Sequence, residues 1–323
     1  MQAGNDGVGR RSVLRGLGAL GLLAALPACS SPFAGVRLTL ATGGTQGVYF
    51  TLGNALADAW QARLGLDVRP AVLSTAGSVD NLARLAAGEA DVVFSQVDTA
   101  AERLDRTAPD DPRALRALAR IYDDVVHVVV PAGSPATSLT DLRGMRVSVG
   151  APNSGVFVIA ERLLAVAELS PERDLEAVQL GINDSVAALA RGEIDAFFWS
   201  GGMPTQGVRD LAAARPIRLL NLEDLITQVR DAYPVYATGT VPAQSYGIPL
   251  PITTLLVRNF LVVRAEMPDD LAAALVEGMF DAQEQLTEAS PAALTIDLRA
   301  AIGTQPVPLH PGAERFFRAE KAS

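Results

Sequence analysis

The sequence predicts an α/β protein of two similar lobes, joined by a two-strand hinge and separated by a ligand cleft. Three observations predict this fold. Short apolar runs alternate with segments of helical periodicity along the chain after residue 35. One pattern of strand, glycine-rich loop and helix occurs twice in the same order. Two long apolar runs, 121–131 and 252–263, have the length needed to cross between lobes.

The first half of the chain opens this pattern. Residues 36–40 alternate as a β-strand does, and the loop 41–47 carries three glycines. Apolar residues then recur three or four positions apart from Val48 to Leu64, which predicts a helix.

The second half repeats the plan. Residues 146–149 predict a strand, 150–155 a glycine-containing loop, and 156–167 a helix. Further on, 85–94 (LAAGEADVVF) resembles 189–198 (LARGEIDAFF), and each reads as a helix end, a glycine stop and a buried strand. Because both matches occur in the same order at nearly the same spacing, we expect two related lobes facing each other.

The two long apolar runs set the expected boundaries. We expect lobe 1 at 36–127 plus 253–323 and lobe 2 at 128–252, with the crossings forming a hinge that lets the cleft close. Outside the strands, Arg113, Arg116 and Arg120 have the spacing of a solvated helix face.

The N-terminus is typical of an export signal. A paired arginine, Arg10-Arg11, precedes the apolar run 16–26, which is too short to span a bilayer of about 30 Å as a helix. The pair resembles a twin-arginine signal, with a general secretory signal as the alternative. Cys29 follows a small residue directly after this run, as in a bacterial lipobox. We therefore expect a signal peptide at 1–28, a lipid on Cys29, a tether at 29–35, and a location in the periplasm or at the outer face of the cytoplasmic membrane.

Composition excludes several functions. The chain of 323 residues has a formal charge of -9, so a nucleic-acid partner is not expected. The single lysine, Lys321, argues against a phosphate loop, and one cysteine with two histidines argues against disulfides and metal clusters. No GxSxG motif is present. We expect neither a cofactor nor an enzyme, and the adjacent Asp123 and Asp124 face opposite sides of a strand rather than sharing an acid–base site.

The two glycine-rich loops predict the ligand site. Ligands of open α/β sheets bind beyond the carboxyl ends of the strands, which places 42–47 and 153–155 at the cleft. Both loops precede helices, whose first N–H groups are unpaired and whose dipole favours an anion. Gln96 follows a buried strand and is expected to point into the same cleft. Ser78 is expected to cap a helix there.

Several motifs resemble those of one known family. Residues 42–49 (TGGTQGVY) look like the opening signature of the TAXI-family solute receptors of TRAP transporters. Further similar segments run along the chain: 76–82, 147–152, 195–199 and 307–315. Together the resemblance covers about residues 36–318.

This resemblance implies a type II periplasmic-binding-protein fold. It implies a receptor that gives a small carboxylate, such as glutamate or 2-oxoglutarate, to an ion-gradient-driven TRAP permease. The implied ligand-binding residues are Thr42, Gly43, Gly44, Thr45, Gly47, Tyr49, Ser78, Gln96, Ser154, Gly155, Trp199 and Gly201. Two alternatives remain open: the binding lipoprotein of an ABC importer for a sulfonate or thiamine-precursor-like solute, and a sensor ectodomain.

Overall fold

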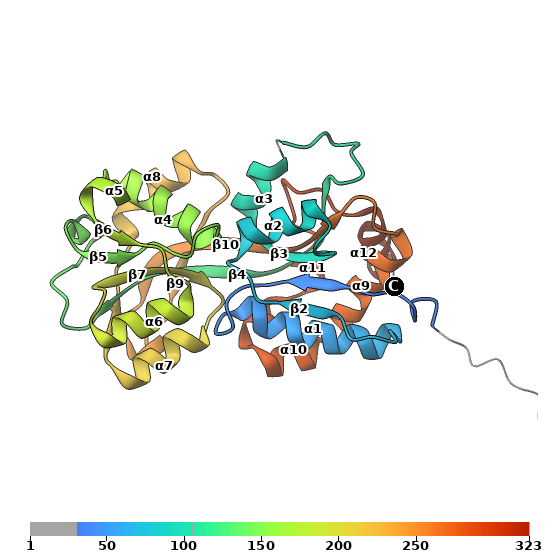
Figure 1. The fold of residues 1–323 in the computed structure, drawn as a ribbon, viewed down its shortest axis with the longest axis horizontal. Coiled ribbons are helices and arrows are strands. Elements are labelled where there is room, and N and C mark those ends of the chain that lie inside the picture. The colour runs from blue at the N-terminus through green and yellow to red at the C-terminus, as the bar shows by residue number, and fades with distance from the viewer. Residues whose placement is uncertain (1–30, 105, 323) are drawn as a thin grey trace, which may run out of the picture.

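The computed structural model describes residues 31–104 and 106–322. Two α/β lobes lie side by side, and both termini of the described chain lie at the lobe on the right of Figure 1. The expected signal peptide and Cys29 lie outside the described residues. None of the helices in the described segments has the length and apolar character to span a membrane.

The strands form one mixed sheet that runs through both lobes. Its order is β2-β1-β3-β10-β4-β7-β5-β6, with β8 paired to β4 and β9 to β10. The strands are β1 (Thr39–Ala41), β2 (Ala71–Leu73), β3 (Val92–Gln96), β4 (Leu115–Pro131), β5 (Arg146–Ser148), β6 (Glu176–Val178), β7 (Ala196–Gly201), β8 (Ile217–Leu219), β9 (Ala237–Val241) and β10 (Ile252–Arg264).

Helices cover the sheet in both lobes (Figure 1). In the first lobe they are α1 (Val48–Leu64), α2 (Ser78–Ala87), α3 (Val97–Leu104), α9 (Asp269–Asp281), α10 (Gln283–Ala289), α11 (Leu298–Ala301) and α12 (Pro311–Ala322). In the second they are α4 (Gly155–Val166), α5 (Pro171–Asp174), α6 (Ile182–Arg191), α7 (Gln206–Ala214) and α8 (Glu223–Ala232). The predicted helix from Val48 to Leu64 is therefore confirmed at both ends.

The repeated plan expected from the sequence is present in the sheet. In one lobe β1 pairs in parallel with β2 and β3, and in the other β5 pairs in parallel with β6 and β7. Gly88 and Gly192 end α2 and α6 with φ of 76° and 72°, and each N–H returns to the last turn of its helix. A residue with a Cβ adopts this left-handed conformation at a cost, which explains the glycine in both copies.

Two long antiparallel strands connect the lobes. β4 and β10 pair with each other through the first lobe as far as Val125 and Leu256. Beyond that point β4 pairs with β7 and β8, while β10 pairs with β9. We propose that the lobes divide at this change of partners, close to the boundaries expected at residues 127 and 252.

The structure corrects three local expectations. Arg116 and Arg120 lie on β4, and Arg113 lies in the turn before it, so the three arginines are not on a helix. Arginines three and four residues apart are typical of a helix face. Here the apolar residues between them are buried in a strand, so the same spacing occurs without a helix. Ser78 is the first residue of α2, and the cap position belongs to Gly77. The first strand begins at Thr39 rather than at residue 36.

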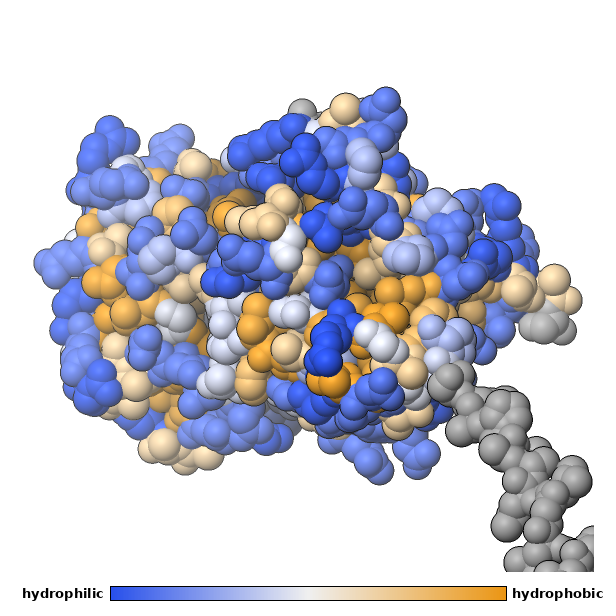
Figure 2. All heavy atoms as spheres, turned by 45° about the vertical axis from the view of Figure 1, so that its right-hand side comes forward, coloured by the Kyte–Doolittle hydropathy of each residue, from blue (hydrophilic) through white to orange (hydrophobic). Residues whose placement is uncertain are grey.

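One of the three buried clusters of the core is shared between the lobes. One cluster of buried residues includes Leu85 and Val97 of the first lobe together with Leu163 and Phe198 of the second. Separate clusters fill the other face of the sheet in each lobe. On the face shown in Figure 2, hydrophilic residues are spread over the surface and apolar ones show between them. The fold is the α/β two-lobe arrangement that the sequence predicted.

Candidate functional site: a cavity between the lobes

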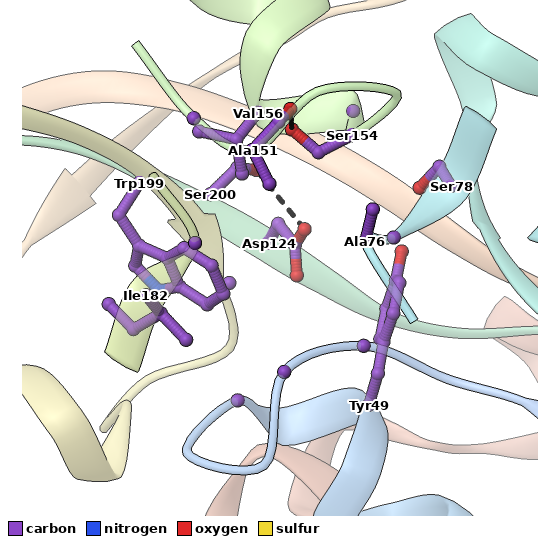
Figure 3. Close-up of a pocket in the computed structure, with 18 of the residues that line it drawn as sticks. Tyr49, Ala76, Ser78, Asp124, Ala151, Ser154, Val156, Ile182, Trp199 and Ser200 are labelled. Atoms are coloured by element: carbon purple, nitrogen blue, oxygen red, sulfur yellow. Dashed lines mark hydrogen bonds between the residues drawn. The ribbon is translucent and has the colours of Figure 1, made fainter. Parts of the chain in front are cut away.

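A cavity lies where the two lobes meet (Figure 3). The centres of water-sized molecules can occupy about 80 Å³ of this cavity. That volume is enough for a small solute. Segments of both lobes line it: 43–44, 47–49, 75–78, 96, 122 and 124 from the first, and 150–151, 154–156, 180–182 and 198–201 from the second. The site is therefore built from pieces that are far apart in the sequence.

Four helices begin at this cavity. Residues at the first turns of α1, α2, α4 and α6 line it, and each helix has ten or more residues. The cap positions of three of them are Gly47, Gly77 and Gly181, and no side chain accepts from their first N–H groups. In α4 the hydroxyl of Ser154 accepts from the N–H of Phe157. In α2 the N–H of Asp80 donates to the carbonyl of Asn153 at 3.0 Å. The other first-turn N–H groups and the helix dipoles favour an anionic group at these walls.

A buried acid forms the floor of the cavity. Asp124 lies on β4 between the lobes and is 2% exposed. Gln96 Nε2 donates to Asp124 Oδ2 and to Ser200 Oγ, both at 2.7 Å, and Ser200 Oγ donates to the same carboxylate oxygen at 3.1 Å. Burial raises the pKa of Asp124 to about 7, although the hydrogen bonds from Gln96, Ser200 and Asn259 oppose this shift.

Two tyrosines stand beside this acid. Tyr49 of α1 donates its hydroxyl to Asn259 Oδ1 on β10, and its ring packs on Phe94 with centroids 4.9 Å apart. The ring of Tyr122, on β4, meets that of Tyr49 edge-on. Burial, and then the nearby charge of Asp124, raises the pKa of both phenols well above the usual value. Both therefore stay protonated.

The lobes approach closely at the start of α4. A Cβ on Gly155 would lie 1.8 Å from Gln96 Oε1 and 3.1 Å from Ser78 Oγ. Only glycine fits this position while the lobes are together. On the opposite wall, Trp199 covers Gly201 and lies against Gly47 of the first lobe, where an added Cβ would be 3.4 Å from the indole. Its Nε1 donates to Thr205 Oγ1 at 2.9 Å.

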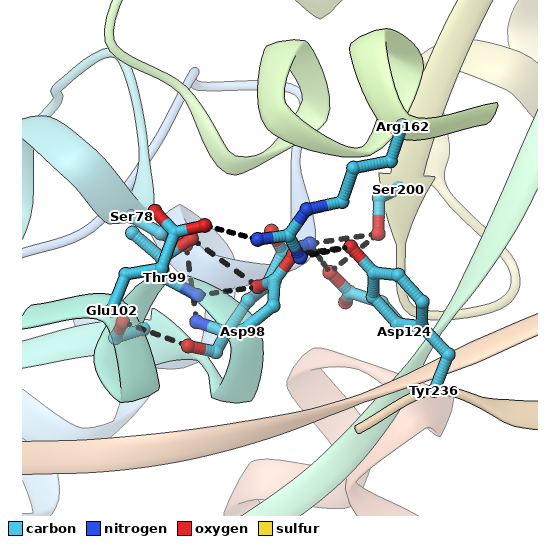
Figure 4. A network of polar contacts seen from close by, with 10 residues as sticks. Ser78, Asp98, Thr99, Glu102, Asp124, Arg162, Ser200 and Tyr236 are labelled. Carbon is cyan, nitrogen blue, oxygen red and sulfur yellow. Dashed lines mark hydrogen bonds and ion pairs between the residues drawn. The ribbon is translucent and has the colours of Figure 1, made fainter. Parts of the chain in front are cut away.

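A charged network joins the lobes beside the cavity (Figure 4). Arg162 of α4 donates to Asp98 Oδ2 at 3.1 Å and to Glu102, both on α3. The hydroxyl of Tyr236 donates to the same Asp98 oxygen at 2.7 Å. Asp98 is fully buried, and burial raises its pKa although Tyr236 and Arg162 act in the opposite direction. The guanidinium also lies over the ring of Tyr233, 4.7 Å from its centroid.

A second interlobe contact closes the other rim. Asn183 of α6 donates to Thr45 Oγ1 at 2.8 Å and accepts from the N–H of Gln46 at 3.3 Å. These groups are exposed, unlike the Arg162 network. The two lobes thus touch on both sides of the cavity.

The family model of the NMT1-like family matches residues 40–320 of this chain. The chain belongs to the NMT1-like family.

Solved structures share the fold of this NMT1-like protein. One, described as a periplasmic transporter, is 15% identical with a TM-score of 0.54, and the match covers 90% of this chain and 94% of the other. A protein of Bordetella bronchiseptica is 20% identical with a TM-score of 0.52, covering 88% and 89%. The ligand-binding component of an ABC-type import system from Staphylococcus aureus, with zinc bound, is 10% identical with a TM-score of 0.50, covering 88% and 92%. These matches show that the chain shares the fold of these proteins.

Most of the site residues that we predict from the sequence line the cavity of this NMT1-like protein. They are Gly43, Gly44, Gly47, Tyr49, Ser78, Gln96, Ser154, Gly155, Trp199 and Gly201. Thr42 and Thr45 do not. Thr42 is fully buried beneath the loop, where its hydroxyl donates to the carbonyl of Leu73 at 2.6 Å. Thr45 is exposed at the rim and bonds Asn183.

Sequence reasoning missed several residues of the site. Asp124 belongs to no motif in the sequence. As expected, it faces the opposite side of the strand from Asp123, which pairs with Arg120 at 2.7 Å. An acid in the middle of an apolar crossing strand was the signal that could have found it. Tyr122, two residues earlier on the same face, follows by alternation. The start of α6, at Gly181 and Ile182, carried no motif.

No group of three or more metal-ligating side chains occurs in the part of the chain that the structure describes. The described lining residues include no histidine, cysteine or lysine, and Ser200 is the lining hydroxyl that donates to the carboxylate of Asp124. His127 is buried outside the cavity lining. Burial lowers the pKa of His127 to about 4, so the ring is neutral. The arrangement is suited to holding a solute by hydrogen bonds and dipoles.

Proposed function

We propose that this protein captures a small solute with an anionic group in the interlobe cavity and delivers it to the membrane domains of an ABC-type importer. The observation that carries the proposal is the convergence of four helix N-termini on one cavity, three of them without a side-chain cap. Such termini bind carboxylates, sulfonates and phosphates through backbone N–H groups. No step of catalysis is part of this proposal.

The choice of transporter rests on the similar proteins. The S. aureus structure of the same fold is a component of an ABC-type import system, and the family match covers nearly the whole chain. The second candidate is an ion-gradient-driven TRAP permease, which the motif at 42–49 favours. Uptake of the bound solute distinguishes them. An ABC importer continues after an ionophore collapses the ion gradients while cellular ATP is maintained, and a TRAP permease stops.

Export and anchoring are part of the same proposal. The arginine pair and the apolar run 16–26 direct the chain across the cytoplasmic membrane, and Cys29 carries the lipid. Several acyl chains are needed for stable attachment, because one alone binds weakly. In cells fed a labelled fatty acid, the wild-type chain takes up the label and stays with membranes. Cys29→Ala should take up none.

Binding itself is tested by identifying what the protein carries. The chain is purified under native conditions, denatured, and the released small molecules are identified by mass spectrometry. The same protein, refolded without solute, is then screened by thermal shift against carboxylates, sulfonates and phosphates. A solute at 100 times its dissociation constant adds about 2.7 kcal/mol of stability, which raises the midpoint by a few degrees. Absence of both a released solute and any shift would refute the proposal.

A further inference from the structure

The floor of the cavity holds three buried oxygen atoms that have no hydrogen-bond partner. They are Asp124 Oδ1, Gln96 Oε1 and the hydroxyl of Tyr122. Each of these residues is 2% exposed, and each lines the cavity. Figure 3 shows the carboxylate of Asp124 pointing into the space between the walls. A buried polar atom without a partner costs about 1–3 kcal/mol, so three in one place mark a missing partner.

The three atoms belong to one network. Asp124 Oδ2 is taken by Gln96 Nε2 and Ser200 Oγ, which leaves Oδ1 as the free oxygen of the carboxylate. The carboxamide of Gln96 must turn its NH₂ group toward this carboxylate, and so Gln96 Oε1 is left as an acceptor. Tyr122 lies two residues before Asp124 on β4, and both side chains line the cavity. The Tyr122 hydroxyl lies near the Asp124 carboxylate, which helps to raise the pKa of Tyr122.

The charged side chain at this floor is acidic, and no basic side chain among the described lining residues balances it. Among the described residues that line the cavity, Asp124 is the one with a charged side chain, and none is Arg, Lys or His. The walls are different, since they present the uncapped N-termini of α1, α2 and α6. The cavity thus has a positive wall and, at its floor, a cluster of acceptors with one acid.

We propose that the solute is a small zwitterion, an amino carboxylate or an aminosulfonate, whose protonated amine binds the acceptors of Asp124 and Gln96 at the cavity floor. This inference rests on the proposed function, because the acidic group of the solute occupies the helix N-termini. An ammonium group has three donors and no acceptor. The third donor is received by the hydroxyl of Tyr122.

Other solutes fit these groups less well. A simple anion leaves the acceptors of Asp124 and Gln96 unpaired and brings a second negative charge toward a buried carboxylate. A simple cation pairs with Asp124 but leaves the helix N-termini unused. A zwitterion satisfies both ends at once and replaces its lost hydration with fixed partners.

Matched pairs of acids test the inference. Calorimetry at pH 8 compares taurine with ethanesulfonate, β-alanine with propionate, and glutamate with glutarate, using the purified chain freed of bound solute. We expect at least one amine-bearing member to bind ten or more times tighter than its partner without the amine. Asp124→Asn should abolish that preference and leave the affinity for the partner equal or higher. Asp123→Asn is the matched control, since its side chain points away from the cavity and pairs with Arg120.

A second variant covers the case in which Asp124→Asn fails to fold. Tyr122→Phe removes one of the three acceptors, so it should weaken the amine-bearing member about 3- to 10-fold without changing its partner. Two results would overturn the inference. Equal or tighter binding of the acid without an amine would do so while leaving the proposed function intact. Failure of every amine-bearing acid to bind would also do so, and the solute released from native protein would then decide the proposed function separately.

Discussion

The unit 39–96 of the first lobe and the unit 146–201 of the second have the same backbone plan but present different surfaces to the solute. Each has a parallel three-stranded sheet, a glycine-rich loop before a helix, and a glycine that ends the second helix. They differ where the third strand ends. The first ends in Gln96, which donates to Asp124. The second carries Trp199 and Ser200 just before its last residue, Gly201, and these supply an apolar wall and one hydroxyl.

This difference separates two roles. The repeated backbone supplies the helix N-termini, which in the proposed function bind the anionic group of the solute without any charged side chain. We propose that the side chains at the ends of these strands, together with Asp124 on the crossing strand, set which group is accepted at the other end. The rims differ in the same way: Arg162 pairs with a buried acid on one side, and Asn183 makes exposed bonds on the other.

The largest expected effect is at the buried rim. Arg162→Met removes the cation that faces Asp98, an acid with no exposed surface. Breaking a buried pair from one side costs about 3–5 kcal/mol of unfolding free energy, measured by denaturant titration. Arg143→Met is the control, since its partner Asp174 lies in the same lobe and Arg143 is 59% exposed. The control should cost under about 1 kcal/mol, and equal losses in both variants would contradict the account.

The next largest effect is expected at Gly47 and Gly155, the corresponding glycines at the starts of α1 and α4. In Gly155→Ala the new Cβ would collide with Gln96 Oε1, so the lobes cannot close as they do here. We expect about 10- to 100-fold weaker solute binding by calorimetry. In Gly47→Ala the nearest atom, the carbonyl of Gly44, is 3.2 Å away, and we expect a loss within about threefold. A larger loss in Gly47→Ala than in Gly155→Ala would reverse the comparison.

The acid at the floor makes stability depend on pH. The pKa of Asp124 is about 7 in the folded chain, against the ordinary aspartate value of 3.8 in the unfolded chain. The folded state therefore keeps the proton to a higher pH. Stability should therefore fall as pH rises from about 4 to about 7, by up to about 4 kcal/mol. Asp98 contributes in the same direction, because burial raises its pKa too. Urea titrations of wild type and Asp124→Asn should diverge across this window, with the variant more stable above pH 7. Parallel curves would show that Asp124 is not the group responsible.

The smallest effect belongs to the exposed rim. Asn183→Ala removes two hydrogen bonds to the loop before α1. Because these groups stay solvated when the bonds are lost, we expect less than about 1 kcal/mol in stability and a few-fold faster solute release. Stopped-flow dissociation measures this rate. A loss as large as that of Arg162→Met would mean that the two rims contribute equally to holding the lobes together.

The sequence predicted what depends on local pattern. The helix from Val48 to Leu64, the glycine stops at Gly88 and Gly192 and the two crossing strands all follow from periodicity and glycine conformation. Ten residues predicted for the site line the cavity, since loops at strand ends follow from the fold class.

The remaining features depend on contacts between distant segments. Asp124 gains its role from Gln96 and Ser200, which lie 28 and 76 residues away. Thr42 is buried because α2 packs beneath its loop, where Asn81 donates to the carbonyl of Thr42. The Arg162 network joins α3 to α4 across the lobes. Contacts between such distant segments cannot be predicted from a local pattern of residue types.

The most direct test of the account is X-ray scattering by the purified chain, with and without the solute that the calorimetry or the mass spectrometry identifies. If the lobes capture the solute by closing on β4 and β10, the radius of gyration must fall when the solute saturates the protein, and Gly155→Ala must not show the fall. An unchanged radius of gyration in the wild-type chain, while calorimetry reports saturated binding, would contradict capture by closure.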